Sequence, residues 1–278
     1  MKVLFTGKGK SGAWEIRGNQ VCQGLRYLGI EADAIPKASV EQMRSYDIIV
    51  LVKRPTFELL DAIRQSGKPF AWDVVDSWPQ PDGNEWNADR ALTWLHTSIK
   101  DVRPNLLICS TRDMLADAEY ANACVIYHHA RPEYLKKRTN WFTVGYEGGL
   151  HYLGRYDEMI RLECEKRRLV WDRHSVENAV LAICLRDCRG YAPEHYKSNV
   201  KLANAQAIGI PALCSPESGY KETSTGGVIW IESPEDLQAA FDTLADPARY
   251  AELCASVDAP PTLAQIAQQY ADQLARLC

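Results

Sequence analysis

Short apolar runs alternate with longer amphipathic stretches along most of the chain. Runs without strict apolar–polar alternation are typical of parallel strands covered on both faces. A stripe formed by Val21, Leu25 and Leu28 predicts a helix that ends at Gly29. The first half is therefore predicted to form an α/β domain with a parallel sheet. Its predicted strands, rich in β-branched or aromatic residues, are 3–5, 31–35, 48–52, 70–75, 106–109 and 124–127.

A second series of strands and helices begins after a change of pattern at residues 128–138. We expect strands at 142–146, 169–171, 179–184, 212–214 and 228–231, and helices at 152–167, 193–208, 234–244 and 262–277. Two such series predict an α/β protein of two Rossmann-like domains facing a cleft. The expected domains are 1–130 and 141–260. A C-terminal helix at 261–278 follows, and one option is that it packs back on the first domain.

The composition excludes several other classes of protein. The chain has 278 residues, of which 46% are hydrophobic, so it can bury a core without disulfides or a metal. No run of about 18 apolar residues is present to cross a bilayer. The nine cysteines are scattered and contain no CxxC pair, which argues against a zinc site. We expect a cytoplasmic protein with no bound metal.

The charge is distributed unevenly. The net charge of −4 argues against a protein that coats nucleic acid. Residues 131–173 contain ten Lys and Arg against seven acids, whereas 232–278 contain eight acids against two arginines. A basic middle suits a phosphate-bearing ligand. It is equally consistent with ordinary solvated helix faces.

A glycine-rich turn, Gly7–Gly12, follows the first strand and matches the GxGxxG pattern. An acid, Glu31 or Asp33, stands about 20 residues later, as in dinucleotide-binding folds. Two lysines and the bulky Trp14 occupy the place where the backbone would have to approach a pyrophosphate. An NAD-dependent oxidoreductase is therefore one alternative, and a turn without any cofactor is another.

A second candidate site lies at the start of the predicted helix 193–208. Ser198 and Asn199 stand near a helix N-terminus, where backbone N–H groups and the helix dipole favour an anion. Lys197 and Lys201 add positive charge. An ordinary capped helix packed on a sheet explains the same residues.

The segment 197–211, followed by Ala212-Leu213-Cys214-Ser215-Pro216, resembles the nucleotide-sugar segment of GT-B glycosyltransferases, and of their group 1 (GT4-like) members in particular. The turn Gly145–Gly149 is similar to the glycine loop of that family's donor domain, and Trp14–Gly18 is similar to its acceptor-side loop. The resemblance implies transfer of a sugar from a nucleotide sugar such as a UDP-sugar, without a metal or other cofactor.

The resemblance also implies roles for individual residues. Retaining members often carry two glutamates at the positions of Tyr196 and Asn204. The resemblance therefore does not settle whether the transfer retains or inverts the sugar's configuration. Arg186 follows a predicted strand at its carboxyl end, where it either grips a phosphate or joins a surface ion pair. The donor-binding candidates are Gly148, Gly149, Arg186, Tyr191, Ser198, Asn199, Lys201 and Asn204. The acceptor-side candidates are Lys10, Ser11, Trp14, Arg17 and Trp78.

The candidates for a catalytic base are carboxylates close to predicted strand ends. Asp76 follows the run 70–75 and is the first choice, with Glu15 the second, although a turn or helix cap explains Asp76 equally well. The acceptor is left open. Small transferases of this layout include phage enzymes that glycosylate modified DNA bases, so DNA is one candidate. A sugar- or nucleotide-binding module without turnover is a further alternative.

Overall fold

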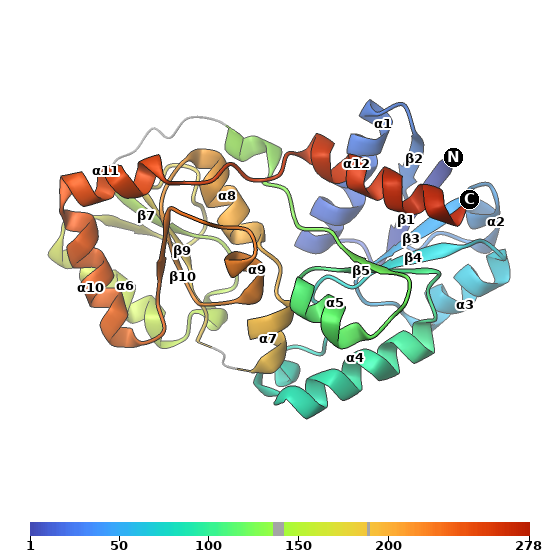
Figure 1. Cartoon of the computed structure of the whole chain (residues 1–278), viewed down its shortest axis with the longest axis horizontal. Helices are drawn as coiled ribbons and strands as arrows, with labels where there is room; N and C mark the ends of the chain where they lie inside the picture. Colours follow the sequence, from blue (N-terminus) through green and yellow to red (C-terminus); the bar gives the residue numbers. More distant parts are fainter. Residues whose placement is uncertain (136–141, 188–189) are drawn as a thin grey trace. The chain divides into compact units, whose positions relative to one another are not determined.

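The computed structural model describes residues 1–135, 142–187 and 190–278. They form two compact units (Figure 1). Each unit contains one parallel β-sheet with helices packed on it, as the sequence predicts. Unit 1 consists of Met1–His128, Gly190–Ser198 and Pro261–Cys278, and unit 2 consists of His129–Arg189 and Asn199–Pro260.

The sheet of unit 1 has six strands in the order β2-β1-β3-β4-β5-β6. Because Gly7 pairs with Val52 and Val52 pairs with Asp73, the carboxyl ends of β1, β3 and β4 meet at one edge of the sheet. The strands are β1 (Lys2–Gly7), β2 (Glu31–Ala34), β3 (Ile48–Val52), β4 (Phe70–Asp73), β5 (Leu106–Cys109) and β6 (Ala123–Val125).

Successive residues of the central strands of unit 1 pack on opposite faces of the sheet. Ile49 and Leu51 of β3 join a core with α3 and α4, whereas Ile48 and Val50 join a second core with α1 and α12. Both faces are covered, which is why the strands are apolar throughout. The helices of unit 1 are α1 (Val21–Tyr27), α2 (Val40–Arg44), α3 (Phe57–Ser66), α4 (Ala88–Val102), α5 (Arg112–Ala118), α7 (Tyr191–Tyr196) and α12 (Leu263–Leu274).

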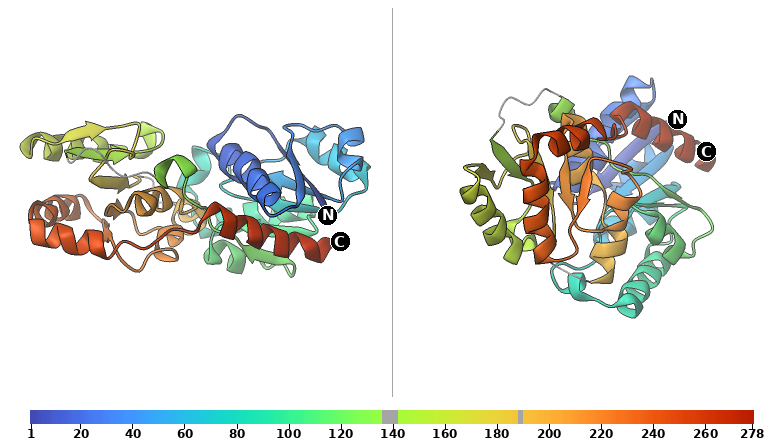
Figure 2. Two further views of the ribbon diagram at one scale, coloured as in Figure 1. Left: turned by 90° about the horizontal axis from the view of Figure 1, so that it is seen from above. Right: turned by 60° about the vertical axis from the view of Figure 1, so that its left-hand side comes forward.

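The C-terminal helix α12, red in Figure 2, lies against α1. Ile266 and Tyr270 on its inner face are fully buried. A Cβ atom at Gly24 of α1 would lie 2.8 Å from the Cβ of Ala267, so the glycine permits the close approach of the two helices. The side chain of Thr262 caps α12 by accepting a hydrogen bond from the Gln265 amide.

The sheet of unit 2 has five strands in the order β11-β10-β9-β7-β8. Leu213 of β10 packs with α6 and α10, whereas Ala212 and Cys214 pack with α8. The strands are β7 (Thr143–Tyr146), β8 (Val170–Asp172), β9 (Leu181–Cys184), β10 (Ala212–Cys214) and β11 (Val228–Trp230). The helices are α6 (Arg155–Lys166), α8 (Val200–Ile208), α9 (Ser218–Lys221), α10 (Pro234–Ala245) and α11 (Pro247–Ala255).

The prediction of one continuous helix at 193–208 is wrong. The segment is divided into α7 and α8 because Lys197 has an extended backbone, with φ −73° and ψ 138°. Helix α11 was not predicted; Pro247 begins it and the Asp246 side chain caps it. The predicted helix 262–277 ends earlier, with a 3₁₀ turn over Ala275–Leu277. Within the described residues, no helix is both long and apolar enough to cross a membrane.

Candidate functional site

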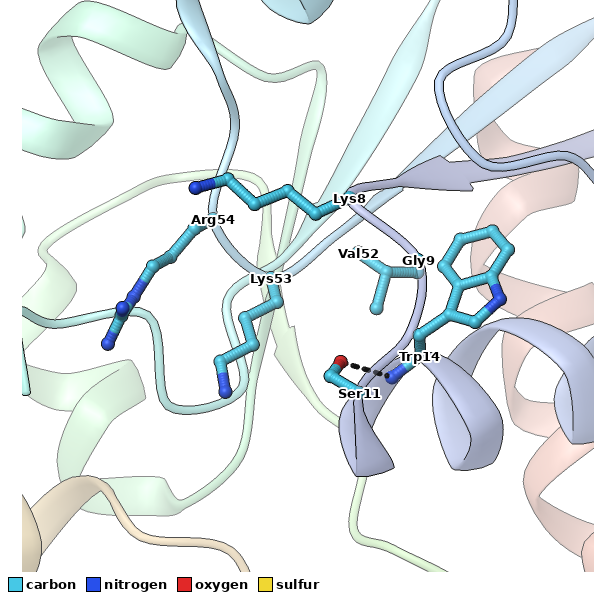
Figure 3. Close-up of a pocket in the computed structure, with 7 residues that line it drawn as sticks. All are labelled: Lys8, Gly9, Ser11, Trp14, Val52, Lys53 and Arg54. Atoms are coloured by element: carbon cyan, nitrogen blue, oxygen red, sulfur yellow. Dashed lines mark hydrogen bonds between the residues drawn. The ribbon is translucent and has the colours of Figure 1, made fainter.

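A cavity of about 190 Å³ opens at the carboxyl edge of the unit 1 sheet (Figure 3). Ligands of open parallel sheets bind at this edge. Its walls come from the turn after β1 and from the residues that end or follow β3. They are Lys8, Gly9, Ser11, Trp14, Val52, Lys53 and Arg54.

The loops at this edge hold unusual backbone conformations. Lys10, Lys53 and Val75, which follow β1, β3 and β4, have φ values of 52°, 64° and 50°. Left-handed backbone is rare outside glycine, and it is a true outlier for a β-branched residue such as Val75. Residues strained in this way cluster at functional sites, where the surrounding structure maintains them.

Asp76 lies between two lysines. Its carboxylate oxygens are 2.7 Å from Nζ of Lys53 and 2.5 Å from Nζ of Lys197. Burial alone would raise the pKa of Asp76, but the two ammonium groups outweigh burial and hold this pKa well below its usual value. A carboxylate held in this way is a weak proton acceptor, so the geometry disfavours Asp76 as the base. It instead fixes the two lysines in place.

Two predicted acceptor-side residues are closed off from any ligand, which corrects their assignment. The fully buried Arg17 pairs with Asp73, with Nε 3.0 Å from the carboxylate, and donates to the carbonyl oxygen of Ile126. The fully buried Trp78 donates from Nε1 to the Asn84 side chain at 2.8 Å. Both side chains therefore support the core of unit 1 and cannot stack on or grip an acceptor.

The other acceptor-side candidates lie at or near the cavity. The Ser11 hydroxyl accepts a hydrogen bond from the Trp14 amide at 3.1 Å, and both residues line the cavity. The Trp14 ring is largely buried and packs over Gly18. Lys10 and Glu15 are exposed. The carboxylate of Glu15, one residue beyond Trp14, accepts a hydrogen bond from Asn19.

In unit 2, the turn after β7 contains Gly148 and Gly149, and a side chain at Gly148 would be strained because of its backbone conformation. Gly148 has φ +137°, and a Cβ atom there would lie 3.1 Å from the Tyr146 hydroxyl and 3.4 Å from Nζ of Lys201. A Cβ atom at Gly149 would lie 2.5 Å from the His151 ring. The Lys201 ammonium also lies 4.1 Å from the centre of the Tyr146 ring. A cation is thus held against a glycine turn at the carboxyl edge of this sheet.

Arg186 follows β9 at the same edge. Its guanidinium is 2.8 Å from the Glu217 carboxylate, and both side chains are buried. The Arg186 amide donates to the Ser215 hydroxyl at 3.0 Å, which ties the loops after β9 and β10 together. The partner of Arg186 in this ion pair is therefore Glu217, and not a near neighbour in sequence.

Asn204 links two loops of unit 2. It donates to the Glu147 carboxylate at 2.7 Å and accepts from the Arg131 amide at 2.9 Å. Since the side chain is also buried, the assignment of Asn204 as a donor-binding residue is corrected. Glu147 also accepts from the Tyr134 hydroxyl.

The remaining donor-side candidates are divided between the units. Tyr191 and Ser198 belong to unit 1, where the Tyr191 hydroxyl donates to Asp117 at 3.0 Å. The Tyr191 hydroxyl is thus engaged within unit 1. Asn199 belongs to unit 2, occupies the position before α8 and is fully buried, and Ser198 is nearly so.

Comparisons with solved structures identify the architecture. The Anabaena protein HepE in complex with UDP is 14% identical, each chain is covered in full, and the TM-score is 0.66. AviGT4, a glycosyltransferase involved in avilamycin A biosynthesis, is 12% identical over 100% of this chain and 98% of its own, with a TM-score of 0.57. The UDP-GlcNAc 2-epimerase of Neisseria meningitidis, bound to UDP-GlcNAc, is 9% identical over 99% of this chain and 100% of its own, with a TM-score of 0.56.

The chain has the GT-B fold. No protein-family model matches the sequence, and no curated protein matches it significantly. In the described part of this GT-B chain, no group of three or more His, Cys, Asp or Glu side chains is arranged to hold a metal ion.

Sequence reasoning missed several residues of these two edges. Lys53 and Arg54 directly follow the most apolar predicted strand, and that position was a signal that could have identified them. Lys8 lies inside the glycine turn, where the sequence pattern indicates only an obstacle to a pyrophosphate. Glu147 and Glu217 carry no comparable signal, because their partners are distant in sequence.

Proposed function

We propose that this protein is a glycosyltransferase that takes its sugar from a nucleotide sugar and transfers it to a hydroxyl group. The GT-B fold, shared with the glycosyltransferase AviGT4 and with HepE bound to UDP, supports this proposal. The observation that carries it is the Lys201 ammonium held against the Gly148–Gly149 turn at the carboxyl edge of the unit 2 sheet. That edge is where open parallel sheets bind ligands.

In this proposal unit 2 binds the donor diphosphate. The turn brings backbone close to the ligand, because neither glycine has a Cβ atom, and Lys201 supplies positive charge. The N-terminus of α8, preceded by Ser198 and Asn199, adds backbone N–H groups. Fixed donors and cations of this kind stabilise the charge that develops on the departing diphosphate. Arg186 contributes less net charge, because Glu217 balances it.

Unit 1 would bind the acceptor. Of the two carboxylates proposed as base, we favour Glu15, because it is exposed, follows the cavity residue Trp14 and is not held between cations as Asp76 is. A UDP-sugar donor, independence of a metal and the group 1 (GT4-like) mode of transfer stay predictions. A modified base in phage DNA is one candidate acceptor.

The same fold occurs in UDP-GlcNAc 2-epimerases, so the products must distinguish the activities. A transferase without its acceptor slowly hydrolyses the donor and releases a nucleoside diphosphate. An epimerase returns a nucleotide sugar with altered sugar configuration. A binding module binds the donor without turnover. An NAD-dependent oxidoreductase that uses Gly7–Gly12 does not consume the nucleotide sugar.

Replacing Lys201 by methionine is expected to lower both UDP affinity and UDP release from UDP-glucose by about 10- to 100-fold, because one charge-assisted contact to the diphosphate is lost. Chromatography of the released nucleotide measures the turnover. Lys166→Met is the control, since Lys166 is 61% exposed on α6 and pairs only locally with Glu163. Equal activity of the two variants would contradict the site, and an isomerised nucleotide sugar without UDP would contradict the transferase.

A further inference from the structure

The cavity of unit 1 has the chemistry of an oxyanion site. Three of its lining residues, Lys8, Lys53 and Arg54, are cations. None of the lining residues, all within the described part of the chain, carries a carboxylate. Figure 3 shows the three long side chains extending in different directions from the loops after β1 and β3, and the Ser11 hydroxyl bonded to the Trp14 amide. Cations that line a cavity attract an anionic group, and their N–H groups can donate hydrogen bonds to it.

Two of the cations, Arg54 and Lys53, are held in place by contacts that leave donors for a ligand. Arg54 donates through Nε and Nη2 to the carbonyl oxygens of Ser77 and Trp78, which uses two of its five N–H groups. Lys53 bonds Asp76 with one of its three ammonium hydrogens. Because Asp76 is shared with Lys197, this single carboxylate does not neutralise the cations at the sheet edge.

A second cavity of about 330 Å³ adjoins the first, because Lys8 and Arg54 line both. Most of its other lining residues are apolar and include Phe57 and Trp94, and one carboxylate, that of Asp101, also lines it. Phe57 is 83% exposed, although it is a large aromatic side chain at the start of α3. Cations on one side and aromatic rings on the other suit a molecule with an anionic end and an apolar body.

We propose that these two cavities bind the acceptor as a phosphate monoester, with the phosphate among Lys8, Lys53 and Arg54 and the apolar part against Phe57. This inference rests on the proposed glycosyltransferase function, because it names the chemical class of that enzyme's acceptor. It requires only unit 1, and it can therefore be tested separately from donor binding.

The test measures binding of inorganic phosphate and of phenyl phosphate to the full chain by calorimetry, without any nucleotide. Phenyl phosphate is expected to bind more tightly, because its ring buries apolar surface. Lys8→Met and Lys53→Met are each expected to weaken both ligands by about tenfold. Phe57→Ala is expected to weaken phenyl phosphate and to leave inorganic phosphate unchanged. Because Lys8 and Phe57 are exposed, these two variants should fold normally.

Lys68→Met is the matched control, because Lys68 precedes β4 at the opposite edge of the same sheet. Equal loss of phosphate binding in Lys68→Met and Lys8→Met would overturn the site. Binding of a short oligodeoxynucleotide, without binding of inorganic phosphate or phenyl phosphate, would overturn it as well. Weakened UDP binding in Lys8→Met would also overturn it, because the cavity would then hold the donor. Phosphate binding that depends on Lys8, without release of UDP from UDP-glucose, would support the oxyanion site and contradict the proposed function.

Discussion

Replacing Arg17 by methionine is expected to lower the free energy of unfolding of unit 1 by about 3–5 kcal/mol, or to prevent folding altogether. The Arg17 and Asp73 side chains are both fully buried and 3.0 Å apart. Burial raises the pKa of Asp73, and the Arg17 guanidinium opposes that rise. Removing Arg17 leaves a buried carboxylate supported chiefly by the Tyr270 hydroxyl, and leaves the Ile126 carbonyl without its donor.

Urea unfolding followed by tryptophan fluorescence measures the effect. Arg26→Met is the control, because Arg26 pairs with Asp33 on the surface, where such a pair contributes at most about 1 kcal/mol. If Arg17→Met does not fold, Tyr270→Phe removes only the hydroxyl that reaches Asp73 and should cost about 1–3 kcal/mol. If Arg17→Met and Tyr270→Phe are both as stable as Arg26→Met, the buried cluster of Arg17, Asp73 and Tyr270 does not stabilise unit 1.

Replacing Glu15 by glutamine is expected to reduce sugar transfer by 10²- to 10⁴-fold, because an amide cannot accept the acceptor's proton. UDP affinity should remain unchanged, since the proposed donor site lies in unit 2. Steady-state transfer and calorimetry together separate the two effects. Near-normal transfer by Glu15→Gln would contradict its role as the base.

Asp76→Asn is the comparison, and its main expected effect is on stability. A carboxyl whose pKa is lowered by folding stabilises the protein above its unfolded pKa of about 3.9, and this stabilisation is lost as the pH falls towards the lower folded pKa. The wild-type protein should therefore lose stability below about pH 4, and Asp76→Asn should be less stable at neutral pH and less sensitive to acid. A variant as stable as wild type but unable to transfer sugar would return the role of base to Asp76.

The sheets could be predicted because their signal is local. Strand β3 is a continuous apolar run, and such runs form parallel strands wherever helices cover both faces. The strand predicted at 70–75 ends at Asp73, since Val75 adopts a left-handed backbone that no residue preference indicates. The division of 193–208 into two helices was not predictable locally, because it accompanies the contact between Lys197 and the distant Asp76.

The candidate sites were predicted less completely, because their chemistry depends on partners far apart in sequence. The resemblance assigns Arg17 to the acceptor side, whereas the folded chain buries it and pairs it with Asp73 and the Ile126 carbonyl. Trp78 is likewise predicted on the acceptor side, whereas it lies in the core and donates its indole N–H to Asn84. In contrast, the two glycines that follow the predicted strand 142–146 after Glu147 located the turn, although not the approach of Lys201 to it.

The most direct test of the central claim is calorimetric titration of the full chain with UDP, thymidine diphosphate and NAD. The proposal predicts that at least one nucleoside diphosphate binds, that Lys201→Met weakens this binding by about tenfold or more, and that NAD does not bind. Binding of NAD without binding of either diphosphate would contradict a nucleotide-sugar site and favour an oxidoreductase that uses the Gly7–Gly12 turn.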